Sequence, residues 1–341
     1  MNPTKPKNYY GVIIITTSAT LLALLALLDM LVNPDEKDAF VTLSVLVQII
    51  TKSIANFLYS NEFYQLSEDL KQFWSFENEE QYKDKFTKTL NVIHKGAKIC
   101  FTYTYVAIIL LVNISLFTSR SLPMYVYVPK MLGKNFIFIF ECVTFPFIAI
   151  NVIAFDYVIF TFLQLTIIQF KLLNSAINKL DVGNLEPQLM CIIKHHIFML
   201  EFTAKLNGIM SMPLFFQVFN SIPSLCFEMY LLRTNVDFCY GVLAVLHSLL
   251  VLIQLAVYCL PCQEVINKGE EVAFNIYSIK WYELEDNSQK TILPIIIMRS
   301  QATIEFSAAG FVAIDRPALV MVFQTSLSFY SFLVAMDGEN Y

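Results

Sequence analysis

The chain has 341 residues, of which 56% are hydrophobic and only 15% are charged. Soluble domains carry about 25% charged residues, so this chain has too little polar surface to enclose its apolar residues in water. Its net charge of −5 is small, and no basic stripe suggests a nucleic-acid partner. The composition indicates an all-α membrane protein in contact with lipid.

Seven stretches are long and apolar enough to cross a bilayer. In chain order they cover residues 11–32, 38–58, 98–118, 136–170, 208–232, 237–260 and 291–336. The first lacks a small-residue cleavage pattern, so we expect an anchor and not a removable signal peptide. The fourth exceeds the bilayer thickness, so its helix must tilt or continue beyond the membrane.

The last stretch is interrupted by Asp315, Arg316 and Pro317, so we predict a seventh helix split in two at Pro317. The second half, 318–336, is apolar overall but carries Gln324 and several hydroxyl residues at its centre. Polar groups at membrane depth need protein or water as partners. This pattern favours a helix that packs against partners or lines water, and a pore helix is the specific hypothesis.

The lysines and arginines set the expected orientation, because they concentrate on the cytoplasmic side. The predicted spans divide the 23 lysines and arginines unequally, and only a few fall on one side of the membrane. These are Lys37, Arg120, Lys130, Lys134 and Arg233, with Arg316 at the break. We therefore expect a cytoplasmic N-terminus, three large cytoplasmic loops and an extracellular C-terminus.

Those loops carry apolar residues at helical spacing, as in Leu66, Leu70, Phe73 and Trp74. The pattern predicts that the spans continue as cytoplasmic helices and pack together as an anchor region, with parts at 171–207 and 261–300. The alternative is a set of helices lying on the membrane surface.

Signals for catalysis or metal binding are weak. Cys259 and Cys262 have metal-like spacing but no second pair, and His195 and His196 lack a third ligand. No phosphate-binding loop or catalytic serine motif is present. We therefore predict no cofactor, no metal and no enzyme activity.

The C-terminal third resembles the insect odorant receptors, a family with seven spans and an internal N-terminus. Four pieces match its terminal pattern in order: Trp281, then Met-Arg-Ser-Gln at 298–301, Ala-Ala-Gly-Phe at 308–311, and Ser-Leu-Ser-Phe-Tyr-Ser-Phe-Leu at 326–333. Weaker similarity extends back to about Leu122. The family's two tyrosines in the final motif are replaced here by Leu327 and Phe329.

The resemblance implies a ligand-gated, non-selective cation channel in the plasma membrane of olfactory sensory neurons. Such a channel is a heterotetramer of this subunit with a shared odorant co-receptor, and four final helices surround the pore. Its ligand would be a small, volatile, mostly apolar molecule. The family pattern places the gate at Phe332 and Met336, with Thr325 and Ser328 continuing the same face inward.

The ligand site implied by the resemblance lies in the outer half, between the second, third, fourth and sixth spans. An odorant needs an apolar cavity with few polar groups. The candidates are Leu43, Val47, Asn113, Leu116, Phe145, Phe147, Asn151, Tyr240, Leu243 and His247. Of these, Asn113, Asn151 and His247 either bind the ligand or pair with a neighbouring helix.

Three alternatives remain. A gustatory receptor of the same superfamily is disfavoured because its usual Thr-Tyr-x5-Gln-Phe ending is absent. A G-protein-coupled receptor has an external N-terminus, opposite to the orientation expected here. A transporter or membrane enzyme would show inverted repeats or paired catalytic groups. The ligand's identity and the subunit stoichiometry are beyond what the sequence indicates.

Overall fold

The computed structural model describes residues 9–32, 38–74, 126–129, 133–180, 185–233, 238–279, 281–283 and 287–338, together with scattered positions between 87 and 122. The third predicted span, 98–118, therefore lies mostly outside the described residues. The elements are α1 (Tyr9–Val32), α2 (Asp38–Leu58), α3 (Ser60–Asp69), η1 (Leu70–Gln72), α5 (Lys134–Asn178), α6 (Leu185–Arg233), α7 (Phe238–Tyr277), η3 (Trp281–Glu283), α8 (Asn287–Gln301), β1 (Ser307–Ala308), β2 (Val312–Ala313) and α9 (Arg316–Gly338).

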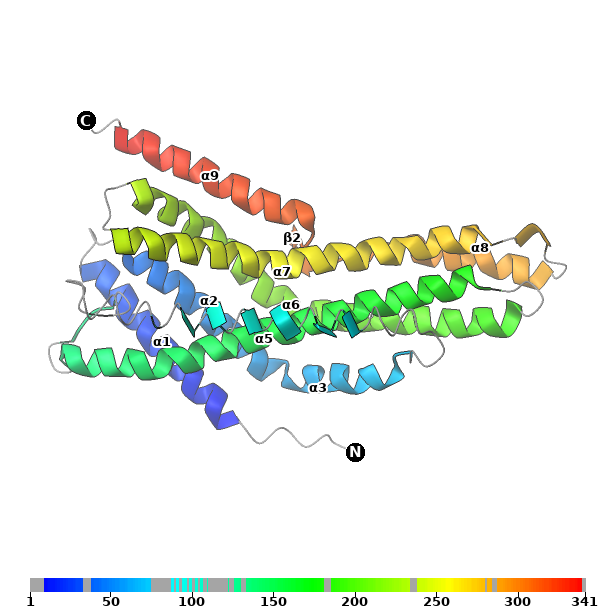
Figure 1. The fold of residues 1–341 in the computed structure, drawn as a ribbon, viewed down its shortest axis with the longest axis horizontal. Helices are drawn as coiled ribbons and strands as arrows, with labels where there is room; N and C mark the ends of the chain where they lie inside the picture. Colours follow the sequence, from blue (N-terminus) through cyan, green and yellow to red (C-terminus); the bar gives the residue numbers. More distant parts are fainter. Residues whose placement is uncertain are drawn as a thin grey trace.

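Three long helices set the shape of the molecule. The helices α5, α6 and α7 have 45, 49 and 40 residues, so each is about 60–75 Å long, roughly twice the bilayer's apolar thickness. They run side by side along the long axis (Figure 1). One half of the molecule also holds α1, α2 and α9, while the other holds α3 and α8. The prediction of an all-α fold whose spans continue as helices is confirmed.

Apolar composition makes these helices membrane-compatible. Within the described residues, five helices are long and apolar enough to cross a bilayer, or six if the bent pair Thr42–Leu58 and Ser60–Gln72 counts as one span. Prolines lie inside α5, α6 and α7, at Pro146, Pro213, Pro223 and Pro261. Helices in lipid retain such prolines because neighbouring groups satisfy the freed carbonyls.

Two apolar cores hold the described helices together. The smaller core joins α1, α2 and the first half of α5, and Ala19 and Ala26 are completely buried in it. Small side chains of this kind let two membrane helices approach closely. The larger core runs along α5, α6 and α7 and takes in Leu66 of α3, Ile296 of α8 and Val322 of α9. The larger core thus spans both halves of the molecule.

The break in the last apolar stretch is longer than predicted and lies earlier in the chain. Helix α8 ends at Gln301, a short hairpin follows, and α9 begins at Arg316. Pro317 is therefore in the first turn of α9, where the missing N–H has no intrahelical partner to lose. With only 15 residues, α8 lies beside α7 in the half that holds α3 (Figure 1). The expected split is confirmed, but α9 alone has spanning length.

The hairpin between α8 and α9 is fixed to α6 by two polar side chains one turn apart. Asn207 Oδ1 accepts the Ser307 N–H at 3.0 Å. The Ser211 hydroxyl donates to the Ser307 carbonyl at 2.8 Å and accepts the Ala309 N–H at 2.9 Å. The turn needs left-handed backbone at Ala309 and Gly310, with φ of 50° and 74°. These contacts determine where α9 starts.

Replacing Ser211 with Ala should loosen this hairpin. The substitution removes the donor to one backbone group and the acceptor of another, at a local cost of about 1–3 kcal/mol. Hydrogen exchange of the purified protein in detergent should become faster at residues 307–311. Ser278→Ala is the control, because that exposed hydroxyl only bonds the carbonyl four residues earlier. Unchanged exchange in Ser211→Ala would show that the hairpin is held by packing alone.

Candidate functional site

A polar stripe on α2 faces the interior of the bundle. Ser44, Gln48 and Lys52 follow one another at four-residue spacing, and they are 3%, 8% and 1% exposed. Four-residue spacing keeps side chains on one face of a helix. Thr51 uses its hydroxyl within α2, on the carbonyls of Val47 and Gln48. Since lipid offers no hydrogen bonds, the inward groups of α2 need partners on other helices.

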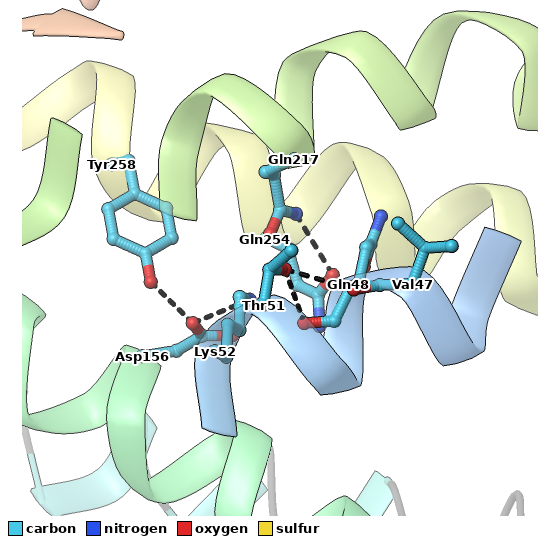
Figure 2. A network of polar contacts seen from close by, with 8 residues as sticks. All are labelled: Val47, Gln48, Thr51, Lys52, Asp156, Gln217, Gln254 and Tyr258. Atoms are coloured by element: carbon cyan, nitrogen blue, oxygen red, sulfur yellow. Dashed lines mark hydrogen bonds and ion pairs between the residues drawn. The ribbon is translucent and has the colours of Figure 1, made fainter. Parts of the chain in front are cut away.

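Lys52 finds its partners on α5 and α7. Its Nζ lies 2.7 Å from Asp156 Oδ1 and 2.9 Å from Oδ2. The Tyr258 hydroxyl donates to the same carboxylate, and Lys52 Nζ is 5.8 Å from the centre of the Tyr258 ring. Figure 2 shows Lys52 and Tyr258 both directed at Asp156. We call Lys52, Asp156 and Tyr258 the lysine cluster; it joins three helices through one ion pair and the hydrogen bond from Tyr258 to Asp156.

A pair of amides lies in the same region. Gln217 of α6 donates through Nε2 to Gln254 Oε1 of α7 at 3.1 Å (Figure 2). Gln217 is 1% exposed, and its Oε1 has no hydrogen-bond partner. The next turn of α6 is bonded to α2, because Asn220 Nδ2 donates a hydrogen bond to the Ser44 carbonyl. This amide pair therefore combines satisfied and unsatisfied polar groups at the centre of the bundle.

A second ionisable cluster joins α6 and α7 nearer the end of α6. Glu228 is 1% exposed, and its two carboxylate oxygens contact His247 Nδ1 and the Ser248 hydroxyl. The His247 side chain is 25% exposed. A carboxylate on Nδ1 orients an imidazole and fixes its tautomer. This glutamate cluster is one place in the half that holds α1, α2 and α9 where a ligand could form a hydrogen bond.

The predicted pocket residues fall into three groups. Leu43, Val47 and Phe145 are partly buried, whereas Phe147 is 61% exposed. Asn151 bonds α2 at both ends of its amide, accepting from Asn56 at 3.0 Å and donating to Ser53 at 2.6 Å. His247 is held by Glu228, as described above. Asn113, Leu116 and the side chains of Tyr240 and Leu243 lie outside the described residues.

The structure leaves much of α9 uncovered by the rest of the chain. Its buried positions are Ala318, Val322 and Ser326, which pack toward α6 and α7. From Leu327 to Met336 no residue is buried. The predicted gate residues Phe332 and Met336 are 59% and 53% exposed; Ser328 is also exposed, and Thr325 is partly buried. All four lie within an arc of about 80° on the helix.

The start of α9 is anchored to α7. Asp315 Oδ1 accepts the Ala318 N–H at 2.9 Å, which caps the helix. Gln263 Oε1 of α7 accepts the Arg316 N–H at 3.4 Å. Together with the hairpin contacts on α6, these bonds fix one end of α9 while its far end has few contacts.

At the opposite half of the molecule, the segment after α3 is clamped onto α5 and α6. The rings of Trp74 and His195 are stacked, with their centroids 4.1 Å apart. The Gln169 side chain bonds both the N–H and the carbonyl of Trp74. Burial, followed by the neighbouring His196, lowers the pKa of His195 to about 4. Burial, followed by Arg299, lowers the pKa of His196 to about 4. Both histidines are therefore neutral packing residues near pH 7.

The same half links α5 to α7 through polar bonds. Asn174 donates to the Lys268 carbonyl at 2.9 Å and accepts from Asn275 at 2.9 Å. Lys171 and Glu264 form an ion pair at 3.2 Å. In the part of the chain that the structure describes, no group of three or more His, Cys, Asp or Glu side chains could hold a metal ion.

Three charged residues of this site were not among the predicted site residues. Lys52 lies inside the second span, Asp156 inside the fourth and Glu228 inside the fifth. A charged residue within an otherwise apolar span is itself a signal of function. The four-residue spacing of Ser44, Gln48 and Lys52 would have identified the inward face of α2.

The described helices define a polytopic helical membrane protein with polar residues directed between its helices. A family model, 7tm Odorant receptor, matches residues 37–327. Odorant receptor 10 of Aedes albopictus is 22% identical over 165 residues, which are 48% of this chain and 44% of that protein. The match thus spans less than half of that relative's length.

Two solved structures have the same fold. The insect olfactory receptor OR5 from Machilis hrabei aligns with a TM-score of 0.83 at 17% identity, over 97% of this chain and 92% of the other. Its complex with eugenol aligns with a TM-score of 0.87 at 16% identity, over 98% and 92%. The family model covers most of the chain, so this protein belongs to the 7tm odorant receptor family.

The lysine cluster predicts a specific pattern of stability. Lys52→Met alone leaves the Asp156 carboxylate buried without its counter-charge, which should cost about 3–5 kcal/mol. The double variant Lys52→Met/Asp156→Leu removes both charges and should recover most of that loss. Thermal unfolding of the purified variants in detergent measures the loss of stability and its recovery. Equal destabilisation by the single and double variants would contradict charge pairing as the cause.

Proposed function

We propose that this chain is a subunit of an odorant-gated, non-selective cation channel that acts with a shared co-receptor. Membership of the odorant receptor family supports the receptor function. The observation that most supports a channel is the stretch of α9 from Leu327 to Met336, in which no residue is buried within the chain. A helix of spanning length that mixes apolar and hydroxyl side chains, and leaves many of them exposed in this stretch, is suited to assemble with copies from other subunits around water.

In such an assembly Phe332 and Met336 form the narrow part of the pore. A ring of large apolar side chains can dewet a narrow passage and block ions, whereas hydroxyl groups keep a passage hydrated. Ser328 and Thr325 supply those hydroxyl groups on the same side of α9, one and two turns toward its start. The fixed start and uncovered end of α9 allow the ring to widen by movement of the helix end.

The proposed ligand is a small, volatile, mostly apolar molecule. The eugenol complex of the Machilis receptor supports this class of ligand. We place its binding site among α2, the third span, α5 and α7, with Leu43, Val47 and Phe145 as apolar lining and His247 as a polar contact. Ligand binding opens the channel only by its tighter binding to the open state.

We further propose the plasma membrane as the location, with the N-terminus in the cytoplasm and the C-terminus outside. The distribution of Lys and Arg supports this orientation. The half of the molecule that holds α3, α8 and the extended ends of α5, α6 and α7 then lies in the cytoplasm. There it serves as the anchor region through which subunits associate.

Current recording tests the function directly. Cells expressing this chain with an odorant co-receptor should give inward cation currents to members of a panel of volatile odorants. The current should be absent from cells expressing the co-receptor alone. If surface labelling shows that the subunit reaches the membrane and no odorant evokes a current, the proposal is wrong. Labels on each terminus of the same protein test the orientation.

The gate assignment predicts a constitutive current. Phe332→Ser should raise the odorant-independent current several-fold, because a hydroxyl in the narrow part of the pore favours water there. Phe323→Ser is the matched control: Phe323 is also exposed on α9, at 45%, but points in the opposite direction. If both variants leave the resting current at the wild-type level, Phe332 does not close the pore.

A further inference from the structure

The buried side chain of Gln217 has one polar atom without a hydrogen-bond partner. Gln217 is 1% exposed, its Nε2 donates to Gln254 Oε1, and its Oε1 has no partner. Turning both amides over would only exchange the roles, leaving Gln217 Nε2 as the unpaired atom. An unsatisfied buried polar group costs about 1–3 kcal/mol. Exchanging the nitrogen and oxygen positions of both amides therefore still leaves one buried polar atom of Gln217 unpaired.

The helix α2 carries a third buried amide, that of Gln48, in the same region as this pair. The helices α2 and α6 run in opposite directions in contact with each other (Figure 1), and Asn220 bonds the Ser44 carbonyl. One turn onward along α2 is Gln48, and about one turn back along α6 is Gln217. Antiparallel register thus brings Gln48, 8% exposed, to the level of Gln217. Figure 2 draws Gln48, Gln217 and Gln254 in the same region as the lysine cluster; Gln217 bonds Gln254, and the backbone carbonyl of Gln48 accepts from Thr51.

We propose that Gln48, Gln217 and Gln254 form a binding site for one hydroxyl group. A hydroxyl donates one hydrogen bond and accepts up to two, so it can donate to Gln217 Oε1 and accept from the amide N–H groups of Gln48 or Gln254. A carbonyl or ether oxygen only accepts and leaves Gln217 Oε1 unpaired. A cation is disfavoured because the charge of Lys52 lies one turn along α2 from Gln48.

The hydroxyl group can come from a water molecule or from an alcohol ligand. Either source can form the hydrogen bonds that these amides lack, since a buried water typically makes about three hydrogen bonds. If the source is an alcohol, the inference rests on the proposed odorant function and names the ligand's functional group. If the source is water, the site is a structural hydration point that joins α2, α6 and α7.

Density at high resolution tests the site without any assay of current. The full chain, assembled with its co-receptor in lipid nanodiscs, should show a density peak within hydrogen-bond distance of Gln217. A peak without added ligand identifies water, and a peak that appears only with hexan-1-ol identifies the alcohol. The peak should be lost in Gln217→Met, which keeps the side-chain volume. No peak in the wild-type protein under either condition overturns the proposal.

Dose–response curves distinguish the two sources in function. Agonists of matched skeleton, an alcohol, its methyl ether and the hydrocarbon, are compared on the wild type, Gln217→Met and the exposed control Gln65→Met. Loss of about tenfold sensitivity to the alcohol alone, the worth of one good hydrogen bond, supports a ligand hydroxyl. An equal shift for all three agonists supports water, and three unchanged curves overturn a role for the site. Absence of any wild-type current would contradict the proposed function, while the density still decides the site.

Discussion

Lipid offers no hydrogen bonds, so the polar groups of these helices must find their partners on one another. The lysine cluster is the clearest consequence. Lys52 is 1% exposed inside an apolar helix, and its charge is balanced by Asp156, whose carboxylate also accepts a hydrogen bond from Tyr258. One charged contact therefore fixes α2, α5 and α7 relative to one another. The amide pair and the glutamate cluster add α6 to the same framework by the same rule.

This framework joins the two halves of the molecule. The helices α5, α6 and α7 extend through both halves, so the polar contacts of the two halves lie on the same three helices. At the other half, Asn174, Asn275 and the Trp74 clamp hold the extended ends together. The hairpin contacts of Asn207 and Ser211 and the cap of Asp315 attach α9 to this framework.

The single chain also shows where it is incomplete. Between Leu327 and Met336 no residue of the last helix is buried, and Tyr330, Leu333 and Val334 are partly buried, although a 23-residue helix usually buries one full face. The buried positions of α9 lie in its first half, at Ala318, Val322 and Ser326.

The sequence alone determined the membrane class, the approximate spans and the helical extensions, because apolar runs and helical periodicity are local properties of the chain. It also indicated the turn at 308–311 and the split before α9. Its prediction of a break at Pro317 was wrong in position, since a proline in a first helical turn does not interrupt a helix. Only the tertiary structure decided that Lys52 pairs with Asp156, that Asn151 bonds Asn56 and Ser53 of α2, and that Gln217 keeps an unpaired oxygen. The contacts of Lys52 and Asn151 join residues about a hundred positions apart. All three features depend on helix rotation and register, which no local pattern encodes.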